Sequence, residues 1–209
     1  MIAVIKYKAG NIASVTNALD RLGAYYFIAE KPNELESSKA VIFPGVGHAG
    51  TAMKSLREKG VDKWLKQTTK PVLGICVGMQ LLYESSTEGD TTGLGIIPGK
   101  LEKFDETKGK VPHMGWNVIT KNDGHPLLKC ISEKQYLYFV HSYYAPINDF
   151  TIGEGDYVNK FAAAVAKDNF MGVQFHPEKS GQVGSLILQN FLDLVHAKQK
   201  IERTAAPCE

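Results

Sequence analysis

Residues 71–80 read Pro-Val-Leu-Gly-Ile-Cys-Val-Gly-Met-Gln, a buried-strand pattern that runs directly into a helical one at Cys76. Glycine stands two positions before and two positions after this cysteine. That spacing is typical of a nucleophile elbow, a strained turn that projects its central side chain from the sheet edge. The N-terminus of the following helix favours the thiolate form of the cysteine. It also offers the Val77 N–H to a developing oxyanion. The stretch therefore predicts a reactive thiol, and the alternative is an ordinary buried cysteine.

Outward from this turn, short apolar runs alternate with longer amphipathic ones, as in a sheet flanked by helices. Asn11 opens the first helix and Gly23 stops it. The pattern predicts strands at 2–5, 25–29, 40–43 and 71–75, and helices at 11–22, 49–67 and from 78. We expect an α/β fold, a three-layer α/β/α arrangement with a central, mostly parallel sheet, flavodoxin-like.

The second half of the chain has a different pattern. Residues 99–174 are strand-rich, with turn signals at 122–124 and 153–155. A last helix is expected over 181–198, with Val183, Leu186, Ile187, Phe191, Leu194 and Val195 on one face. Without a repeat or linker, residues 1–200 are expected to form one domain, and residues 201–209 a disordered tail.

Composition limits the classes of function. Among 209 residues, 44% are hydrophobic and 22% charged, and the net charge of +2 forms no basic block. Nucleic acid and membrane surfaces are therefore not expected partners. The three cysteines, Cys76, Cys130 and Cys208, are too scattered for a disulfide framework, so we expect a cytoplasmic protein. No spacing matches a zinc or iron site and no G-x-G-x-x-G follows the first strand, so neither metal nor cofactor is expected.

A thiolate nucleophile needs a base, and the base needs a group that orients it. His176 follows the apolar run 171–175 and precedes Pro177-Glu178. Extended backbone would place positions i and i+2 on the same side, so His176 and Glu178 are expected to lie side by side. The alternative is a surface turn. His141 and Ser142 are neighbours on a strand and are not expected to form a catalytic pair.

A possible oxyanion loop lies at residues 44–47, Pro-Gly-Val-Gly, after the third strand. Its glycines allow the backbone to approach a ligand and present N–H groups to it. Taken alone, the segment favours a plain loop between strand and helix.

Together, an oxyanion loop, G-x-C-x-G-x-Q and H-P-E in this order resemble the class I (triad) glutamine amidotransferases. Within that family the chain looks most like the amidotransferase subunits of imidazole glycerol phosphate synthases. The narrower likeness rests on Pro-Gly-Val-Gly at 44–47, Ala-Gly-Asn at 9–11, PHMGWN at 112–117 and YFVHSY at 138–143. There is one departure, since Lys6-Tyr7-Lys8 stands where the family often has an acidic residue followed by Tyr-Gly.

The resemblance implies a role for each matching residue. Cys76 attacks the glutamine amide, His176 serves as base and acid, and Glu178 orients His176. Backbone N–H groups of Gly45, Val46, Gly47 and Val77 surround the oxyanion. The glutamine is held by Gln80, Glu88, Ser142 and Tyr143, although Glu88 can also be read as a solvated loop acid and Gln80 as a solvent-facing helix residue.

The resemblance also implies a partner, a TIM-barrel cyclase that forms a heterodimer with this chain and receives its ammonia. Asn11, Trp116 and Tyr138 would lie towards that partner, although Trp116, Tyr138 and Met114 could equally be core. Three other readings stay open. They are an amidotransferase serving another synthase (anthranilate, aminodeoxychorismate or GMP), a stand-alone γ-glutamyl cysteine hydrolase, and a binding protein on the same fold.

Overall fold

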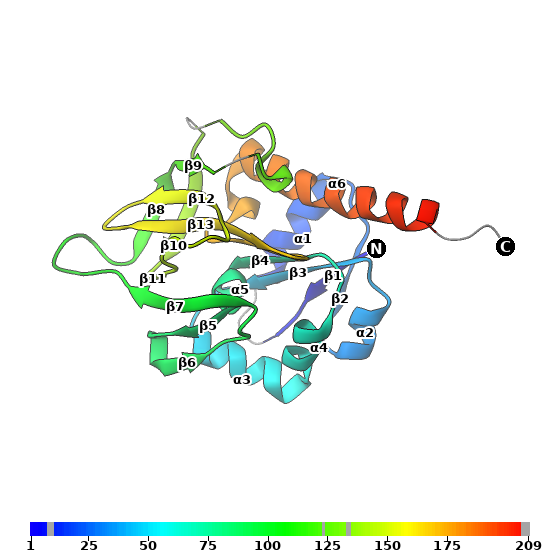
Figure 1. The fold of residues 1–209 in the computed structure, drawn as a ribbon, viewed down its shortest axis with the longest axis horizontal. Helices are drawn as coiled ribbons and strands as arrows, with labels where there is room; N and C mark the ends of the chain where they lie inside the picture. The colour runs from blue at the N-terminus through cyan, green and yellow to red at the C-terminus, as the bar shows by residue number, and fades with distance from the viewer. Residues whose placement is uncertain (8–10, 123, 133–134, 206–209) are drawn as a thin grey trace.

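In the computed structural model, described residues are 1–7, 11–122, 124–132 and 135–205, with residues 198–205 as backbone only. Within these residues the centre is an eight-stranded sheet with helices on both faces (Figure 1). Lys8, Ala9, Gly10, Asp123 and Cys208 lie outside the described residues, so predictions that include them stay predictions. No described helix is long and apolar enough to cross a membrane.

The central sheet has a parallel part and an antiparallel part. The parallel part contains the strands that the sequence predicts first, in the order β2 (Tyr26–Ala29), β1 (Ile2–Ile5), β3 (Ala40–Gly45), β4 (Val72–Cys76) and β14 (Phe170–Val173). Every residue of β1, β3, β4 and β14 is buried, as expected where helices cover both faces. The antiparallel part continues with β13 (Lys160–Lys167), β12 (Thr151–Asp156) and β9 (Ile119–Lys121).

The helices form the outer layers and confirm the expected three-layer fold. Figure 1 shows α1 (Ile12–Arg21) and α6 (Gly181–Ala205) on one face, and α2 (Pro32–Glu36), α3 (Ala49–Lys59) and α4 (Val61–Gln67) on the other. The single helical region predicted over 49–67 is two helices, because Gly60 takes a left-handed conformation with φ of 70° between them. The sequence pattern does not predict α2.

The two smaller sheets lie at one end of the molecule, at the left in Figure 1. One sheet pairs β8 (His113–Asn117) with β10 (Leu137–His141), and another has the order β11 (Tyr143–Tyr144), β7 (Ile97–Lys103), β5 (Tyr83–Ser86), β6 (Thr91–Thr92). The short helices are α5 (Val77–Gln80), η1 (Glu88–Asp90), η2 (Pro126–Leu128) and η3 (Pro177–Lys179). The strand-rich half therefore begins at Tyr83, earlier than the predicted residue 99.

The predicted turn at residues 153–155 is wrong, because Gly153 and Gly155 lie inside β12. A Cβ on Gly155 would approach the Phe161 ring to 2.3 Å, so this glycine makes room for a neighbouring side chain. The chain reverses two residues later, where the Tyr157 N–H donates to the Asn159 carbonyl at 3.2 Å. A glycine pair in sequence does not distinguish a turn from a crowded strand.

The helix predicted from Gly78 is a single turn, α5, so few peptide dipoles add up behind Cys76 and the helix dipole contributes little there. At the other end of the chain, α6 continues to Ala205, beyond the predicted end at residue 198 and into the expected tail. Residues 206–209 are not described.

Candidate active site

Cys76 occupies a strained position at the junction of β4 and α5. Its φ of 53° and ψ of −111° fall outside the regions that L-residues prefer, at a cost of about 1–3 kcal/mol. The flanking glycines make this turn possible. A Cβ on Gly78 would lie 1.8 Å from the Phe43 carbonyl oxygen, and a Cβ on Gly74 would lie 2.7 Å from the Met79 nitrogen. The spacing of the two glycines is therefore required by the backbone that passes on either side of the elbow.

His176 and Glu178 form a buried pair next to this cysteine. Nδ1 of His176 lies 2.8 Å from a Glu178 carboxylate oxygen, and both side chains are almost fully buried. The pairing is as predicted but the backbone path differs, because Pro177 begins the 3-10 helix η3 instead of continuing an extended strand. Hydrogen bonds fix the backbone of His176 on both sides. Its backbone N–H donates to the Tyr138 carbonyl at 2.8 Å, and its backbone carbonyl accepts from the Ser180 hydroxyl at 2.7 Å.

The surroundings of His176 favour its protonated form. Burial is the largest influence and acts to lower the pKa of His176, but hydrogen bonds and charge interactions with Cys76 and Glu178 together outweigh it and raise that pKa. Since the thiolate is the nucleophilic form of cysteine, an imidazolium beside the sulfur suits the attack that the sequence predicts.

A cavity of about 280 Å³ opens over the cysteine. Its walls come from the loop after β3, the elbow, η1, the loop before β8, the end of β10, the start of β11, and η3 with the residue before it. The lining residues are Val46, Gly47, Cys76, Val77, Gln80, Glu88, Pro112, Val140, His141, Ser142, Tyr143, His176 and Lys179. The structure thus gathers most of the site residues predicted from sequence around one space.

Two predicted site residues lie behind the cavity wall. Gly45 is the last residue of β3 and pairs with Cys76 in the sheet, where a Cβ would meet the Tyr7 hydroxyl at 2.6 Å and the Gly78 nitrogen at 2.7 Å. Glu178 lies behind His176. Gly47, in contrast, faces the cavity and has φ of 88°, which fits the predicted need for glycine in this loop.

Gln80 and Glu88 are both tied into the site. Gln80 is buried, and its amide nitrogen donates to the Tyr143 carbonyl and to the Gln174 side-chain oxygen, each at 3.0 Å. The reading of Gln80 as a solvent-facing residue is therefore wrong. A Glu88 carboxylate oxygen accepts the Ala49 N–H at 2.7 Å, so Glu88 is not a freely solvated loop acid.

Sequence reasoning missed five residues at or next to this site. Four of them line the cavity, and Gln174 lies behind it with its amide nitrogen 3.7 Å from the Cys76 sulfur. The missed residues are Pro112, Val140, His141, Gln174 and Lys179. A signal was available for Gln174 and His141, because a glutamine interrupts the apolar run 171–175 and a histidine ends the apolar run 137–141. His141 makes no pair with Ser142, since its two ring nitrogens contact His113 and the Tyr143 carbonyl.

The residues predicted to face a partner are partly exposed. Trp116 and Met114 are 55% and 62% exposed, so the core reading is wrong for both. Trp116 pairs in register with Tyr138 across β8 and β10, with ring centroids 5.7 Å apart. Asn11 is half-buried and its amide donates to the Ser14 hydroxyl at 2.9 Å.

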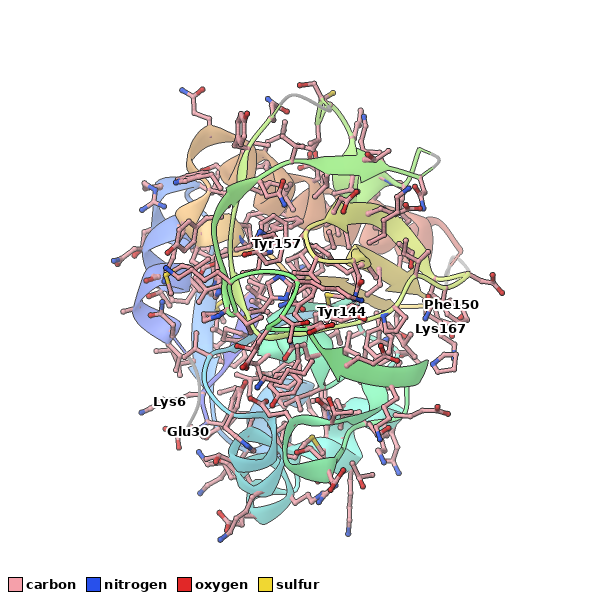
Figure 2. All side chains as sticks on the ribbon, turned by 90° about the vertical axis from the view of Figure 1, so that its left-hand side faces the viewer. Lys6, Glu30, Tyr144, Phe150, Tyr157 and Lys167 are labelled. Atoms are coloured by element: carbon pink, nitrogen blue, oxygen red, sulfur yellow. The ribbon has the colours of Figure 1, made fainter. Side chains whose placement is uncertain are left out.

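Lys6 is paired where the family often has an acid. Its ammonium lies 2.9 Å from Glu30, which also contacts Lys59 at 2.8 Å, and Figure 2 shows Lys6 and Glu30 together at the edge of the molecule. The positive charge of Lys6 is thus paired with the carboxylate of Glu30 in the same chain. Among the described residues, no cluster of His, Cys, Asp and Glu has the arrangement of a metal site.

Comparison with known proteins agrees with the motifs. The sequence matches the family model of the class-I glutamine amidotransferases over residues 3–195. It is 50% identical over 197 residues to the imidazole glycerol phosphate synthase subunit HisH of Bacteroides fragilis, covering 92% of this chain and 99% of that one. It is 49% identical over 202 residues to the subunit of the same name from Sulfurimonas denitrificans, covering 91% and 97%.

Solved structures with low sequence identity share the fold. A glutamine amidotransferase crystal structure superposes with a TM-score of 0.73 at 19% identity, covering 93% of this chain and 98% of that one. A structure of PurLQS from Thermotoga maritima gives 0.71 at 20% identity, covering 93% and 98%. At such identities the likeness concerns the fold alone.

Proposed function

Because this chain belongs to the class-I glutamine amidotransferase family, we propose that it hydrolyses glutamine as the glutaminase subunit of an imidazole glycerol phosphate synthase. The observation that carries the proposal is the strained Cys76 in contact with the buried His176–Glu178 pair. A thiol, a base and a carboxylate that orients the base are what acyl transfer through cysteine requires. We place the protein in the cytoplasm, because Cys76 and Cys130 are free cysteines and the Cys76 thiol must stay reduced to react.

In the first step, the Cys76 thiolate, whose proton His176 already holds, attacks the side-chain amide carbon of glutamine. The resulting tetrahedral intermediate carries negative charge on the former carbonyl oxygen. Backbone N–H groups of Val46, Gly47 and Val77, whose residues line the cavity, are the donors for that charge. Each donor of this kind contributes about 10²–10³ in rate in comparable enzymes.

In the second step, His176 gives its proton to the amide nitrogen, the C–N bond breaks, and ammonia leaves a γ-glutamyl thioester on Cys76. Water then attacks the thioester carbon while His176 takes a proton from it. Glutamate departs and the thiolate is restored. Glu178, 2.8 Å from the imidazole, keeps the ring oriented through both steps.

The cavity has groups suited to each end of glutamine. The Glu88 carboxylate suits the α-ammonium group, and the backbone at Ser142 and Tyr143 suits the α-carboxylate. Gln80 lines the same space, and its side-chain oxygen suits the substrate amide because its own amide nitrogen already donates to two oxygens.

Ammonia released into bulk water mostly becomes ammonium, which is not nucleophilic, so a second active site must receive it directly. We assign that site to a TIM-barrel cyclase that forms a heterodimer with this chain and combines ammonia with a phosphoribulosyl formimino aminoimidazole carboxamide ribotide. The products are imidazole glycerol phosphate and aminoimidazole carboxamide ribotide. Trp116 and Tyr138, with Asn11, form the surface that meets the cyclase, because exposed aromatic pairs are common anchors at interfaces.

The decisive experiment measures glutamate release from glutamine by the chain alone and with the cyclase and its ribotide substrate. We expect weak release alone, strong stimulation by the loaded cyclase, and loss of both in Cys76→Ala. Labelling of Cys76 by a glutamine-mimicking affinity reagent without cyclase stimulation would redirect the assignment to another synthase. Robust turnover without any partner would support a stand-alone γ-glutamyl hydrolase.

A further inference from the structure

A chain of buried polar groups runs from β8 to the Cys76 sulfur. It begins at Asn117, whose amide nitrogen lies 3.4 Å from Nε2 of His113, and Nδ1 of His113 lies 3.0 Å from Nε2 of His141. Nδ1 of His141 lies 2.9 Å from the Tyr143 carbonyl oxygen. The partners come from β8, β10 and β11, which belong to the two smaller sheets.

The chain continues on the other side of that carbonyl. The Tyr143 oxygen also accepts from the Gln80 amide, which donates a second time to Oε1 of Gln174, each at 3.0 Å. Nε2 of Gln174 then points at the Cys76 sulfur from 3.7 Å. Gln174 is completely buried.

The direction of every hydrogen bond follows from one fixed group, because a backbone carbonyl only accepts. His141 must carry its proton on Nδ1 to donate to Tyr143, which leaves Nε2 to accept from Nδ1–H of His113. Nε2 of His113 then accepts from the Asn117 amide. By the same logic Gln80 must present its nitrogen to Tyr143, so Gln174 presents oxygen to Gln80 and nitrogen to the sulfur.

The surroundings keep both histidines in the neutral form that this order needs. His113 stacks between Phe139 and Tyr157, with ring centroids 5.0 and 4.2 Å away, and His141 packs against Phe104 and Phe161 at 5.3 and 5.1 Å. Burial lowers the pKa of His113 to about 4 and is the main cause that lowers that of His141 to about 3. Figure 2 labels Tyr144 and Tyr157 in this aromatic region.

We propose that Gln174 donates a hydrogen bond to the Cys76 thiolate, and that His113 and His141 are positioning residues that set its orientation through Tyr143 and Gln80. A donor aimed at the sulfur stabilises the charged form over the thiol, which instead points its proton at the Val140 carbonyl 3.8 Å away. His176 and Tyr7 interact with Cys76, with Glu178 behind His176. The other titratable groups that line the cavity around the sulfur are Glu88, His141, Tyr143 and Lys179. Gln174 adds a donor without adding a charge.

The test is the pH dependence of Cys76 alkylation by iodoacetamide, followed on the peptide that carries Cys76, because exposed Cys130 also reacts. Replacing the donor with an apolar chain of similar length, Gln174→Met, is expected to move the half-maximal pH of alkylation upward by about one unit. Asn190→Leu is the matched control, because Asn190 is also a buried amide but donates to the Leu127 and Lys129 carbonyls. It is expected to keep the wild-type profile.

A pair of His141 variants tests the positioning step separately. In His141→Asn the amide nitrogen takes the place of Nδ1 and keeps the bond to the Tyr143 carbonyl, whereas in His141→Gln the amide lies where Nε2 was and that bond is lost. We expect the Asn variant to stay near the wild-type profile and the Gln variant to shift upward like Gln174→Met. If Gln174→Met does not fold, the His141 pair decides.

The inference rests on the proposed role of Cys76 as nucleophile, but the two can fail separately. Glutamate release that survives Cys76→Ala would remove the proposed function. Loss of release in Cys76→Ala, combined with a wild-type alkylation profile in Gln174→Met, would overturn only the role of Gln174. Equal profiles for the two His141 variants would overturn the positioning role of the histidines.

Discussion

The elbow at Cys76 and the polar chain around His141 both end at the Cys76 sulfur. The residues that form the elbow are close together in the sequence, whereas those that form the polar chain are far apart. The elbow takes its conformation from residues 74–78 and from the backbone of the neighbouring β3. The polar chain joins residues from 80 to 174, on the elbow helix, both small sheets and the loop after β14. A site can therefore combine one part that short-range sterics determine with another that exists only after the whole chain has folded.

The largest expected effect breaks the elbow itself. Gly78→Ala places a methyl group 1.8 Å from the Phe43 carbonyl oxygen, a backbone atom that cannot rotate away. We expect a loss of at least about 3 kcal/mol in the free energy of unfolding or failure to fold, measured by urea denaturation. Gly23→Ala is the control, because Gly23 has φ of 64° but no atom within 4 Å of the added Cβ, so it should lose about 1 kcal/mol. Similar losses in the two variants would mean that crowding against the Phe43 carbonyl does not require glycine at position 78.

The next effect concerns His176, the proposed base, which contacts the elbow cysteine and is paired with Glu178. Glu178→Gln keeps the shape of the side chain but removes the negative charge that orients the His176 ring and stabilises its protonated form. We therefore expect kcat to fall by about 10²–10⁴. Because the pKa of His176 is raised in the folded protein, its stabilisation is fully present below about pH 6.5 and is lost as pH rises through the raised value. Melting temperature followed from pH 6 to 10 should therefore decline less steeply in Glu178→Gln. A parallel decline in both proteins would contradict this assignment of the charge.

A smaller effect of opposite sign is expected at Tyr7, beneath the elbow. Its hydroxyl is buried, has no hydrogen-bond partner among the described residues, and faces Gly45. Burial is the main cause that raises the pKa of Tyr7, so the group is a neutral, unsatisfied phenol. Tyr7→Phe should therefore raise the free energy of unfolding by about 1 kcal/mol, measured by thermal and urea melts. Destabilisation would show that the hydroxyl has a partner in the folded protein.

The smallest effect is expected at Glu30, on the exposed edge of the parallel part. Hydrogen bonds and charge interactions with Lys59 and Lys6 lower the pKa of Glu30 to about 2. Its stabilisation is therefore present above about pH 4.5 and is lost as pH falls towards the lowered value. Since the pair is exposed and screened, Glu30→Gln should leave the urea midpoint at pH 7 nearly unchanged, and any difference should vanish in high salt. A large loss at pH 7 would show that Glu30 does more than balance Lys6.

The predictability of the elements follows the same division. Strands β1, β3 and β4 are continuous apolar runs bounded by clear helix signals, and their positions could be predicted because burial on both faces leaves one pattern. The meaning of a glycine in the sequence was ambiguous, because it can end an element or lie inside one. Gly60 breaks a helix that hydrophobic spacing predicts as continuous, whereas Gly155 sits inside a strand where a turn was predicted. In both cases the deciding contact or conformation lies outside the local pattern.

The site divides likewise. Cys76, His176 and Glu178 could be predicted because each carries a local signature, glycine spacing in one case and His-Pro-Glu in the other. His141 and Gln174 could not be assigned a role, because an isolated histidine or glutamine in an apolar run is compatible with several environments. Their role depends on which carbonyl and which amide the fold brings within 3 Å.

The sequence by itself thus determined the parallel strands, the family and the candidate nucleophile with its candidate base, because these depend on residues a few positions apart. Only the tertiary structure decided that Gly45 stands behind the cavity, that Gln80 is buried, and that two neutral histidines connect β8 to the site. The reason is physical. Steric limits on a backbone turn act within a few residues, whereas the direction of a buried hydrogen bond is set by whichever partner the folded chain supplies.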